Sequence, residues 1–382
     1  MIRDDMHVPA NSHIGVMVIP AALALAQREG WTGSQLLKSI VAGYDMAAAL
    51  GTAVRQAGLC NPHFRPSGII GAFGSAAAAI VGETREIERA VAVSALSFGV
   101  NMAAGLNEWA WAGGTEIYTH MGTASRSGIA AMELAKAGMR SSETILEGSD
   151  GVFEAYRLAK VNGKWDEDGA VGAADSFAEW MTSSRVGSGI LDVKFKPVAG
   201  CNFIQTPLSI ALKLSQDLEL ASVIGQIEKV LINTTSAAKA YPGCDSLGPF
   251  EQVGQAKMSI QYGVAAGLLF GRIDDSTYQQ YDDSTLQGLI QKCTVVIEGE
   301  FDGDFAEGRQ PSRVEVMMKD GKKAQSGLAD VPWLEGEAVL RRFQKEAGVI
   351  YSAEVVGQIV KECLGLRDRK TCSRLFNLLG SS

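Results

Sequence analysis

Residues 68–81 read GIIGAFGSAAAAIV, a run made almost entirely of glycine, alanine, serine and a few larger apolar residues. Small side chains let helices approach closely, so this run predicts a helix buried among other helices. Apolar residues at helical spacing predict further helices on both sides of it, over 34–49 with Ser34 as its cap, over 85–100 and over 125–137. We therefore predict a close-packed helical arrangement for residues 1–190.

The chemically densest stretch is the N-terminus, which holds Asp4, Asp5, His7 and His13. Carboxylates and imidazoles are the usual groups of general acid–base catalysis. A loose, solvated chain end is the alternative, but the apolar run GVMVIPAALALA over 15–26 favours a cluster held against a buried helix. A metal site on these four side chains is disfavoured because a chain start rarely provides the rigid frame that metal ligands need, and we predict no metal.

The pattern changes near Lys194. Residues rich in β-branched side chains predict strands over 223–234 and 293–297, and alternating residues predict one over 314–318, before a turn at Asp320–Gly321. From residue 335 the pattern is helical again. The prediction is a mainly α fold, with a helical domain formed by residues 1–193 and 331–382 and an inserted α+β domain over 194–330. Within that insert, residues 205–218 and 255–269 are predicted helices.

Composition excludes several classes of function. A net charge of −8, with a pI near 5.2 and no basic cluster with interleaved aromatics, argues against nucleic-acid binding. The longest apolar runs are alanine-rich and interrupted, so we predict no membrane span. The six scattered cysteines form no CxxC pair, and no signal peptide is visible; both features predict reduced thiols in the cytoplasm.

Four isolated residues have two interpretations each. His120 in THMGTASRSG could be a buried, hydrogen-bonded histidine, but its small neighbours favour a pocket. Arg65 in NPHFRPSG could hold a carboxylate bidentately or form an ordinary ion pair. Lys196 in KFKPVAGC, taken alone, is typical of a solvated group, and Tyr262 in MSIQYGVAAG is typical of a core residue.

Taken together, the chain resembles the 2-methylcitrate dehydratase/cis-aconitate decarboxylase family, also called MmgE/PrpD, which includes iminodisuccinate epimerase. The resemblance implies a helical domain built from both chain ends, a smaller α+β lid, an active site between them, and a homodimer. It also implies reactions on di- or tricarboxylates without metal or other cofactor, in which a proton moves next to a carboxylate. The segments that carry it are DDMHVPANSHIGVMVIPAALALAQ, HFRPSGIIGAFGSAAAAIVG, THMGTASRSGIAAMELAKAGM, ILEGSDGVF, KPVAGCNFIQTPLSIAL and AKMSIQYGVAAGLL.

The resemblance also implies the site residues. The catalytic residues would be Asp5, His13, Lys196 and Tyr262, and the substrate-binding residues would be Arg65, His120 and Gln205. In these roles His13 or a desolvated Lys196 is the base, Asp5 orients His13, and Tyr262 donates to a developing oxyanion.

Four positions depart from the family pattern. Met6 stands where threonine is usual, and Ile117 replaces a lysine found in some decarboxylases. Arg65 and Gln205 each replace a histidine. Loss of two imidazoles removes groups that move protons near neutral pH, and an arginine cannot act as a base. We therefore expect a non-standard carboxylate substrate, as in specialised metabolism.

The predicted function is that of a cofactor-independent lyase or isomerase that abstracts a proton next to a carbonyl or carboxylate. The alternative is a catalytically impaired paralogue that binds a small acid or pairs with a full-length family member. Family members usually carry a helical segment before the Asp4–Asp5 pair, whereas here Met1 stands directly before it. A true start farther upstream would make a mitochondrial location the alternative to the cytoplasm.

Overall fold

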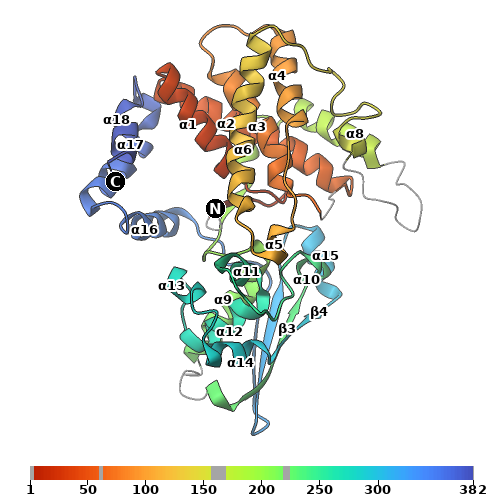
Figure 1. Cartoon of the computed structure of the whole chain (residues 1–382), viewed down its shortest axis with the longest axis vertical. Helices are drawn as coiled ribbons and strands as arrows, with labels where there is room; N and C mark the ends of the chain where they lie inside the picture. Colours follow the sequence, from red (N-terminus) through yellow and green to blue (C-terminus); the bar gives the residue numbers. More distant parts are fainter. Residues whose placement is uncertain (1–3, 60–62, 156–168, 218–223, 382) are drawn as a thin grey trace. The chain divides into compact units, whose positions relative to one another are not determined.

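The computed structural model describes residues 4–59, 63–155, 169–217 and 224–381. Contacts divide the chain into two compact units. The mixed unit comprises Met1–Asp4, Asn107–Ile117 and Lys196–Leu334, and the helical unit comprises Asp5–Leu106, Tyr118–Phe195 and Glu335–Ser382. The protein is mainly helical, as predicted (Figure 1).

The helical unit depends on close approach of small residues. A β-carbon on Gly43 of helix α2 (Gly33–Gln56) would lie 2.8 Å from the carbonyl oxygen of Gly74 in α3 (Pro66–Gly82). One on Gly99 of α4 (Arg89–Asn101) would lie 2.9 Å from the carbonyl oxygen of Ala72 in α3. The run over 68–81 is therefore the buried helix that its composition predicts (Figure 1). The helices of this unit are α1 (Gly15–Glu29), α2 (Gly33–Gln56), α3 (Pro66–Gly82), α4 (Arg89–Asn101), α6 (Glu116–Lys136, in this unit from Tyr118), α7 (Val152–Ala155), α8 (Gly169–Thr182), α16 (Gly336–Ala347), α17 (Ala353–Leu364) and α18 (Ser373–Leu379).

Two details of the N-terminal prediction are wrong. The cap of α2 is Thr32 and not Ser34, because the Thr32 side chain accepts from the backbone N–H of Gln35 while the Gln35 side chain accepts from that of Thr32. Residues 1–190 are also not wholly helical. Strand β1 (Asp5–His7) pairs antiparallel with β2 (Val193–Phe195), which fixes the acidic start of the helical unit to a segment almost 190 residues later.

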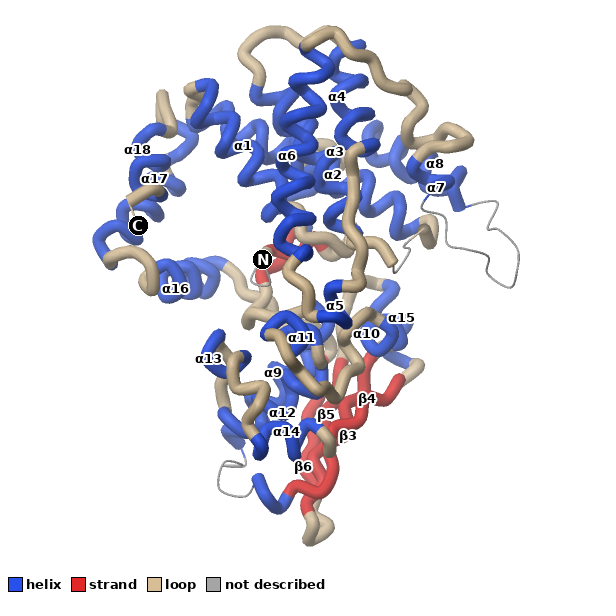
Figure 2. Tube along the Cα trace, viewed as in Figure 1, coloured by secondary structure: helices blue, strands red, loops and turns tan. Residues whose placement is uncertain are grey.

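The mixed unit is built on a four-stranded sheet in the order β4-β3-β5-β6. The predicted strands appear as β3 (Ile227–Thr234), β4 (Cys293–Ile297) and β5 (Ser312–Met318), and β5 turns at Asp320–Gly321 into β6 (Lys323–Leu328). Strands β3 and β4 are parallel, and the other two pairs are antiparallel. Helix α9 packs against β5 and β6, and α12 against β4 (Figure 2). The helices of this unit are α5 (Trp109–Ala112), α9 (Gln205–Asp217), α10 (Ser236–Ala240), α11 (Val253–Met258), α12 (Ile260–Phe270), α13 (Asp275–Tyr278), α14 (Ser284–Ile290) and α15 (Glu300–Ala306).

The single helix predicted over 255–269 is two helices. Ser259 separates α11 from α12 with an extended backbone, and its hydroxyl accepts from the N–H of Tyr262. Serine favours a cap over a helix interior because its side chain satisfies an N–H group that the helix leaves unpaired. Of the strand predicted over 223–234, residue 223 lies outside the described residues, Ile224–Gln226 form a turn of 3₁₀ helix, and the strand β3 begins only at Ile227. Cys60 also lies outside the described residues.

Candidate active site

His13 is held by the backbone of Asp5. Its Nδ1 lies 2.6 Å from the Asp5 carbonyl oxygen, and the ring is 8% exposed. A carbonyl can only accept a hydrogen bond, so Nδ1 donates to it, and a neutral ring in this tautomer has its lone pair on Nε2. The His13 N–H donates to Ser67 Oγ in the first turn of α3. The imidazole is thus fixed in the tautomer that a general base requires.

The Asp5 side chain makes contacts separate from those of its carbonyl group. Its carboxylate accepts from the backbone N–H of Gly15, the first residue of α1, at 3.2 Å and from the hydroxyl of Tyr44 at 2.6 Å. A carboxylate at a helix N-terminus is stabilised by unpaired N–H groups. A β-carbon on Gly15 would lie 2.3 Å from the Tyr44 hydroxyl, so a larger residue would displace the Tyr44 or Asp5 side chain. Asp5 therefore orients His13 through its main chain and anchors α1 through its side chain.

Arg65 and His120 meet around Gly105. The N–H of Arg65 donates to the Gly105 carbonyl, and a β-carbon on Gly105 would lie 3.3 Å from Cβ of Arg65 and 3.2 Å from Nδ1 of His120. Gly105 has a φ of +140°, a conformation that L side chains rarely adopt. Arg65 precedes Pro66, the first residue of α3, and is 9% exposed. The arginine and the histidine thus belong to one local cluster.

Lys196 forms a buried ion pair in the mixed unit. Its Nζ lies 2.9 Å from Oδ1 of Asp4, and the two side chains are 1% and 6% exposed. Nζ also donates to the carbonyl of Gly200 at 3.4 Å. Lys196 is therefore held in a buried ion pair, and its catalytic role stays a prediction.

Gln205 holds the loop that follows Lys196. Its Nε2 donates to the carbonyls of Val198, Gly200 and Cys201, and its Oε1 accepts from the N–H of Val198. The side chain is fully buried. The structure thus gives Gln205 a loop-positioning contact, whereas substrate binding by this residue stays a prediction.

Tyr262 lies in the core of the mixed unit. Its hydroxyl donates to the carbonyl of Thr277 at 2.8 Å, and burial raises the pKa of the phenol well above its usual range. Its ring stacks on Tyr278, whose hydroxyl donates to the carbonyl of Ala199 in the Lys196 loop. These contacts support a positioning role for Tyr262, while its predicted role as proton donor stays a prediction.

His7 belongs to the same N-terminal stretch but faces another environment. Its Nδ1 accepts from the N–H of Ala10, and its Nε2 lies 3.9 Å from the carboxylate of Asp192. Burial outweighs that carboxylate and lowers the pKa of the imidazole to about 4. His7 is therefore a neutral structural histidine in β1.

The predicted residues fall into two groups. The helical unit holds Asp5, His13, Arg65 and His120, and Ser67 connects His13 to the turn that Arg65 precedes. The mixed unit holds Lys196, Gln205 and Tyr262 on or against one loop. Sequence reasoning missed the roles of Asp4, Tyr44 and Gly105. The position of Asp4 beside Asp5 marks it as a candidate site residue, but nothing in the sequence pairs it with Lys196.

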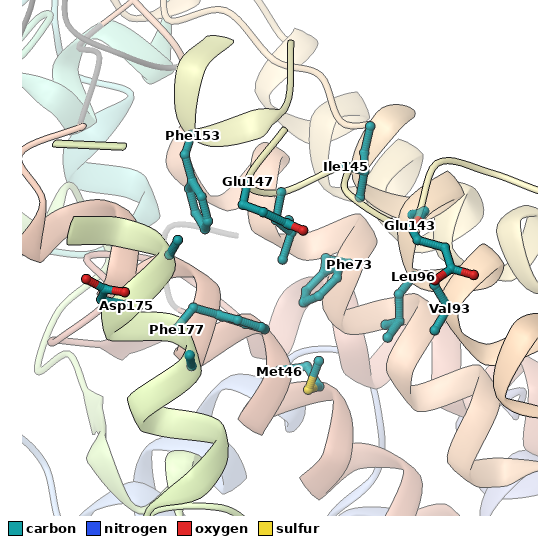
Figure 3. Close-up of a pocket in the computed structure, with 14 residues that line it drawn as sticks. Met46, Phe73, Val93, Leu96, Glu143, Ile145, Glu147, Phe153, Asp175 and Phe177 are labelled. Carbon is teal, nitrogen blue, oxygen red and sulfur yellow. The ribbon is translucent and has the colours of Figure 1, made fainter. Parts of the chain in front are cut away.

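A separate cavity lies within the helical unit. Its volume is about 480 Å³, and its walls are mainly apolar, with Phe73, Phe153 and Phe177 among them (Figure 3). Glu143, Glu147 and Asp175 are the charged residues among those that line it (Figure 3). None of the predicted site residues lines this cavity.

Two searches bear on cofactors and membranes. Among residues 4–59, 63–155, 169–217 and 224–381, no group of three or more His, Cys, Asp or Glu side chains is arranged to hold a metal ion. Within the same residues, no helix combines the length and the hydropathy of a membrane-crossing segment.

Comparison with known proteins gives two family matches and one relative. The MmgE/PrpD N-terminal domain model matches residues 3–161, and the MmgE/PrpD C-terminal domain model matches residues 199–347. The chain is also similar to the cis-aconitate decarboxylase-like protein oryM of Aspergillus oryzae. That protein is 23% identical over 397 aligned positions, which cover 98% of this chain and 79% of the relative.

Proposed function

Because this chain belongs to the MmgE/PrpD family, we propose that it is a lyase or isomerase that moves a proton at a carbon next to a carboxylate. The observation that carries the proposal is the 2.6 Å contact between Nδ1 of His13 and the Asp5 carbonyl. It leaves the basic lone pair on Nε2, and an imidazole is the side chain best suited to accept a proton near neutral pH.

The first step is proton transfer from the substrate carbon to Nε2 of His13. The electron pair of the broken C–H bond moves into the adjacent carboxyl group, which becomes an enolate-like dianion. The imidazolium that forms keeps its Nδ1–H bond to Asp5, and the Asp5 carboxylate holds the backbone beneath it through Gly15. Positioned acid–base groups of this kind contribute about 10²–10⁴-fold to rate.

A cation stabilises the dianion in this proposal. Arg65 binds a substrate carboxylate through its planar guanidinium, because that geometry matches a carboxylate bidentately. Lys196, whose side chain is held by Asp4 and Gly200 within the mixed unit, stays a predicted catalytic residue.

The second step defines the reaction type. In a dehydratase the enolate-like pair forms a C=C bond while hydroxide leaves the neighbouring carbon and takes up a proton to become water, and in an isomerase the pair is reprotonated on carbon. In a decarboxylase the C–CO₂ bond breaks in place of the C–H bond, its electron pair moves into the adjacent unsaturated acid, and a protonated group returns a proton to carbon. Arg65 and Gln205 replace imidazoles of the family pattern, so we propose a carboxylate substrate other than the standard ones. A homodimer, a cytoplasmic location and metal-independent chemistry stay predictions.

Proton exchange tests the proposal without knowledge of the full reaction. The protein is incubated in D₂O with cis-aconitate, 2-methylcitrate and a set of other di- and tricarboxylates, and proton NMR follows loss of signal next to the carboxylates. We expect deuterium incorporation or product formation with at least one acid. His13→Ala lowers the rate about 10²–10⁴-fold, the contribution of a general base.

A matched variant shows whether the loss of rate is specific to His13 or follows from the loss of any histidine. His63 is exposed and is not one of the proposed groups, so His63→Ala keeps the wild-type rate. Equal rates in wild type and His13→Ala exclude His13 as the base. No exchange with any acid, together with tight binding of one, favours the non-catalytic paralogue.

A further inference from the structure

We propose that Cys201 and Cys244 form an oxidisable dithiol, whose disulfide restrains the Lys196 loop and switches off turnover. The two Sγ atoms lie 3.7 Å apart in the mixed unit. Neither cysteine is in a disulfide in this structure. The existence of the disulfide stands on this geometry alone, whereas its effect on turnover rests on the proposed function.

Backbone hydrogen bonds hold the two cysteines in place. The Cys201 N–H donates to the carbonyl of Lys257, and the Cys244 carbonyl accepts from the N–H of Ile260. Both partners flank the junction between α11 and α12, so the cysteines are fixed to one rigid segment. A disulfide needs an S–S distance of about 2.05 Å, which side-chain rotation and a small backbone shift supply from this starting point.

The environments of the two thiols indicate which of them the oxidant reaches first. Cys201 is partly exposed, whereas Cys244 is fully buried. Burial and the contact with Cys201 raise the pKa of the Cys244 thiol. A thiolate is the nucleophile in oxidation, so the accessible Cys201 reacts first and Cys244 resolves the product.

Each step balances with a hydroperoxide as the oxidant. The Cys201 thiolate attacks the terminal oxygen of the hydroperoxide, the O–O bond breaks, and the alkoxide or hydroxide leaves to give a sulfenic acid. The Cys244 sulfur then displaces hydroxide from that sulfenic acid, and the proton lost from Cys244 converts the hydroxide to water. The two sulfurs lose two electrons, which the peroxide bond takes up.

The disulfide acts on the loop that carries Lys196. Cys201 follows Gly200, whose carbonyl accepts from Lys196 Nζ, and the Cys201 carbonyl accepts from Gln205. Drawing Cys201 toward Cys244 displaces both carbonyls. A misplacement of about 1 Å at a catalytic group costs on the order of 10²-fold in rate, so oxidation lowers turnover at least tenfold.

The test uses the full chain and hydrogen peroxide as the probe. Reduced protein is treated, quenched with N-ethylmaleimide, digested and mapped by mass spectrometry, and turnover is measured before treatment, after it and after dithiothreitol. We expect a peptide pair linked through Cys201 and Cys244, a loss of two hydrogen atoms from the intact mass, and turnover that falls and then recovers with reductant.

Three variants make the outcome decisive. Cys244→Ser leaves Cys201 without a resolving thiol, so peroxide oxidises Cys201 to sulfinic acid and the lost turnover does not recover with reductant. If Cys244→Ser does not fold, Cys244→Ala is used in its place. Cys363→Ser removes an exposed thiol of the helical unit and keeps the linked peptide.

Two outcomes contradict the proposal. Maleimide found on both Cys201 and Cys244 after peroxide treatment shows that no disulfide forms, and a linked protein with unchanged turnover shows that the disulfide does not control the Lys196 loop. Absence of turnover before oxidation counts against the proposed function, while the peptide map still decides the dithiol.

Discussion

The ammonium of Lys196 lies 2.9 Å from the carboxylate of Asp4, and both side chains are withdrawn from solvent although they are 192 positions apart in the chain. Removal of one partner leaves an uncompensated buried charge, which costs about 3–5 kcal/mol. We expect Asp4→Asn to lower the free energy of unfolding by such an amount, measured by urea denaturation. Asp4→Asn combined with Lys196→Met restores part of the loss.

The matched control for that variant is an exposed pair of the same kind. Asp320 and Lys322 pair at 2.9 Å with 55% and 83% of their side-chain surfaces exposed. Water and salt screen an exposed ion pair, so Asp320→Asn changes stability little. Equal losses in Asp4→Asn and Asp320→Asn contradict the importance of the buried pair.

His7 makes stability depend on pH. Its pKa is about 4 in the folded protein and about 6.5 in the unfolded chain, so the unfolded state binds more protons between these values. Stability is therefore complete above pH 6.5 and falls as the pH drops toward 4. The two pKa values give a loss of about 2 kcal/mol between pH 7.5 and pH 5 from this residue.

Denaturation at the two pH values checks this prediction. In His7→Asn the amide oxygen replaces Nδ1 as acceptor for the N–H of Ala10, but the residue does not titrate. The variant therefore shows a smaller difference between pH 7.5 and pH 5 than the wild type. The same pH dependence in both proteins rules out His7 as its source.

Gln205→Glu tests whether Gln205 positions the Lys196 loop. The substitution removes the donor to three carbonyls and places a carboxylate oxygen against them. Each unpaired buried group costs about 1–3 kcal/mol, so we expect a large fall in thermal stability. Gln344→Glu on the exposed side of α16 serves as the control and leaves stability unchanged. A stable Gln205→Glu protein would exclude a role in holding the loop.

Tyr262→Phe separates a structural hydroxyl from a proton donor. Loss of the bond to Thr277 costs about 1–3 kcal/mol because that buried carbonyl loses its partner, and turnover stays within about tenfold of wild type for a positioning residue. Loss of a proton donor instead lowers turnover by about 10²–10⁴-fold without a comparable loss of stability. Denaturation and NMR rates on the same variant therefore decide between the two roles.

Gly105→Ala tests the cluster of Arg65 and His120. The added methyl group contacts both residues, and the backbone at φ +140° is strained for alanine, so substrate affinity and turnover fall. Gly138 also has a positive φ, +92°, but nothing lies within 4 Å of an added methyl group there. Gly138→Ala therefore lowers the stability of the fold but leaves substrate affinity and turnover unchanged. Unchanged kinetics in Gly105→Ala contradicts a substrate-binding role for the cluster.

The sequence by itself determined the elements and the family. Glycine and alanine spacing defined α3, alternation defined β5, and the order of short segments gave the MmgE/PrpD assignment. These features depend on local geometry and on residue size, which a linear sequence records directly. The break at Ser259 was missed because a serine is compatible with both a helix interior and a cap.

Only the tertiary structure decided which groups the predicted site residues contact. The sequence named Asp5, His13, Lys196 and Gln205, but the tautomer of His13 depends on a backbone carbonyl, and the partner of Lys196 is Asp4. Gln205 meets three carbonyls because the loop folds back on α9. Protonation and hydrogen bonding depend on distances between groups far apart in the chain. Residue identity supplies the donors and acceptors, and the fold alone decides which of them meet.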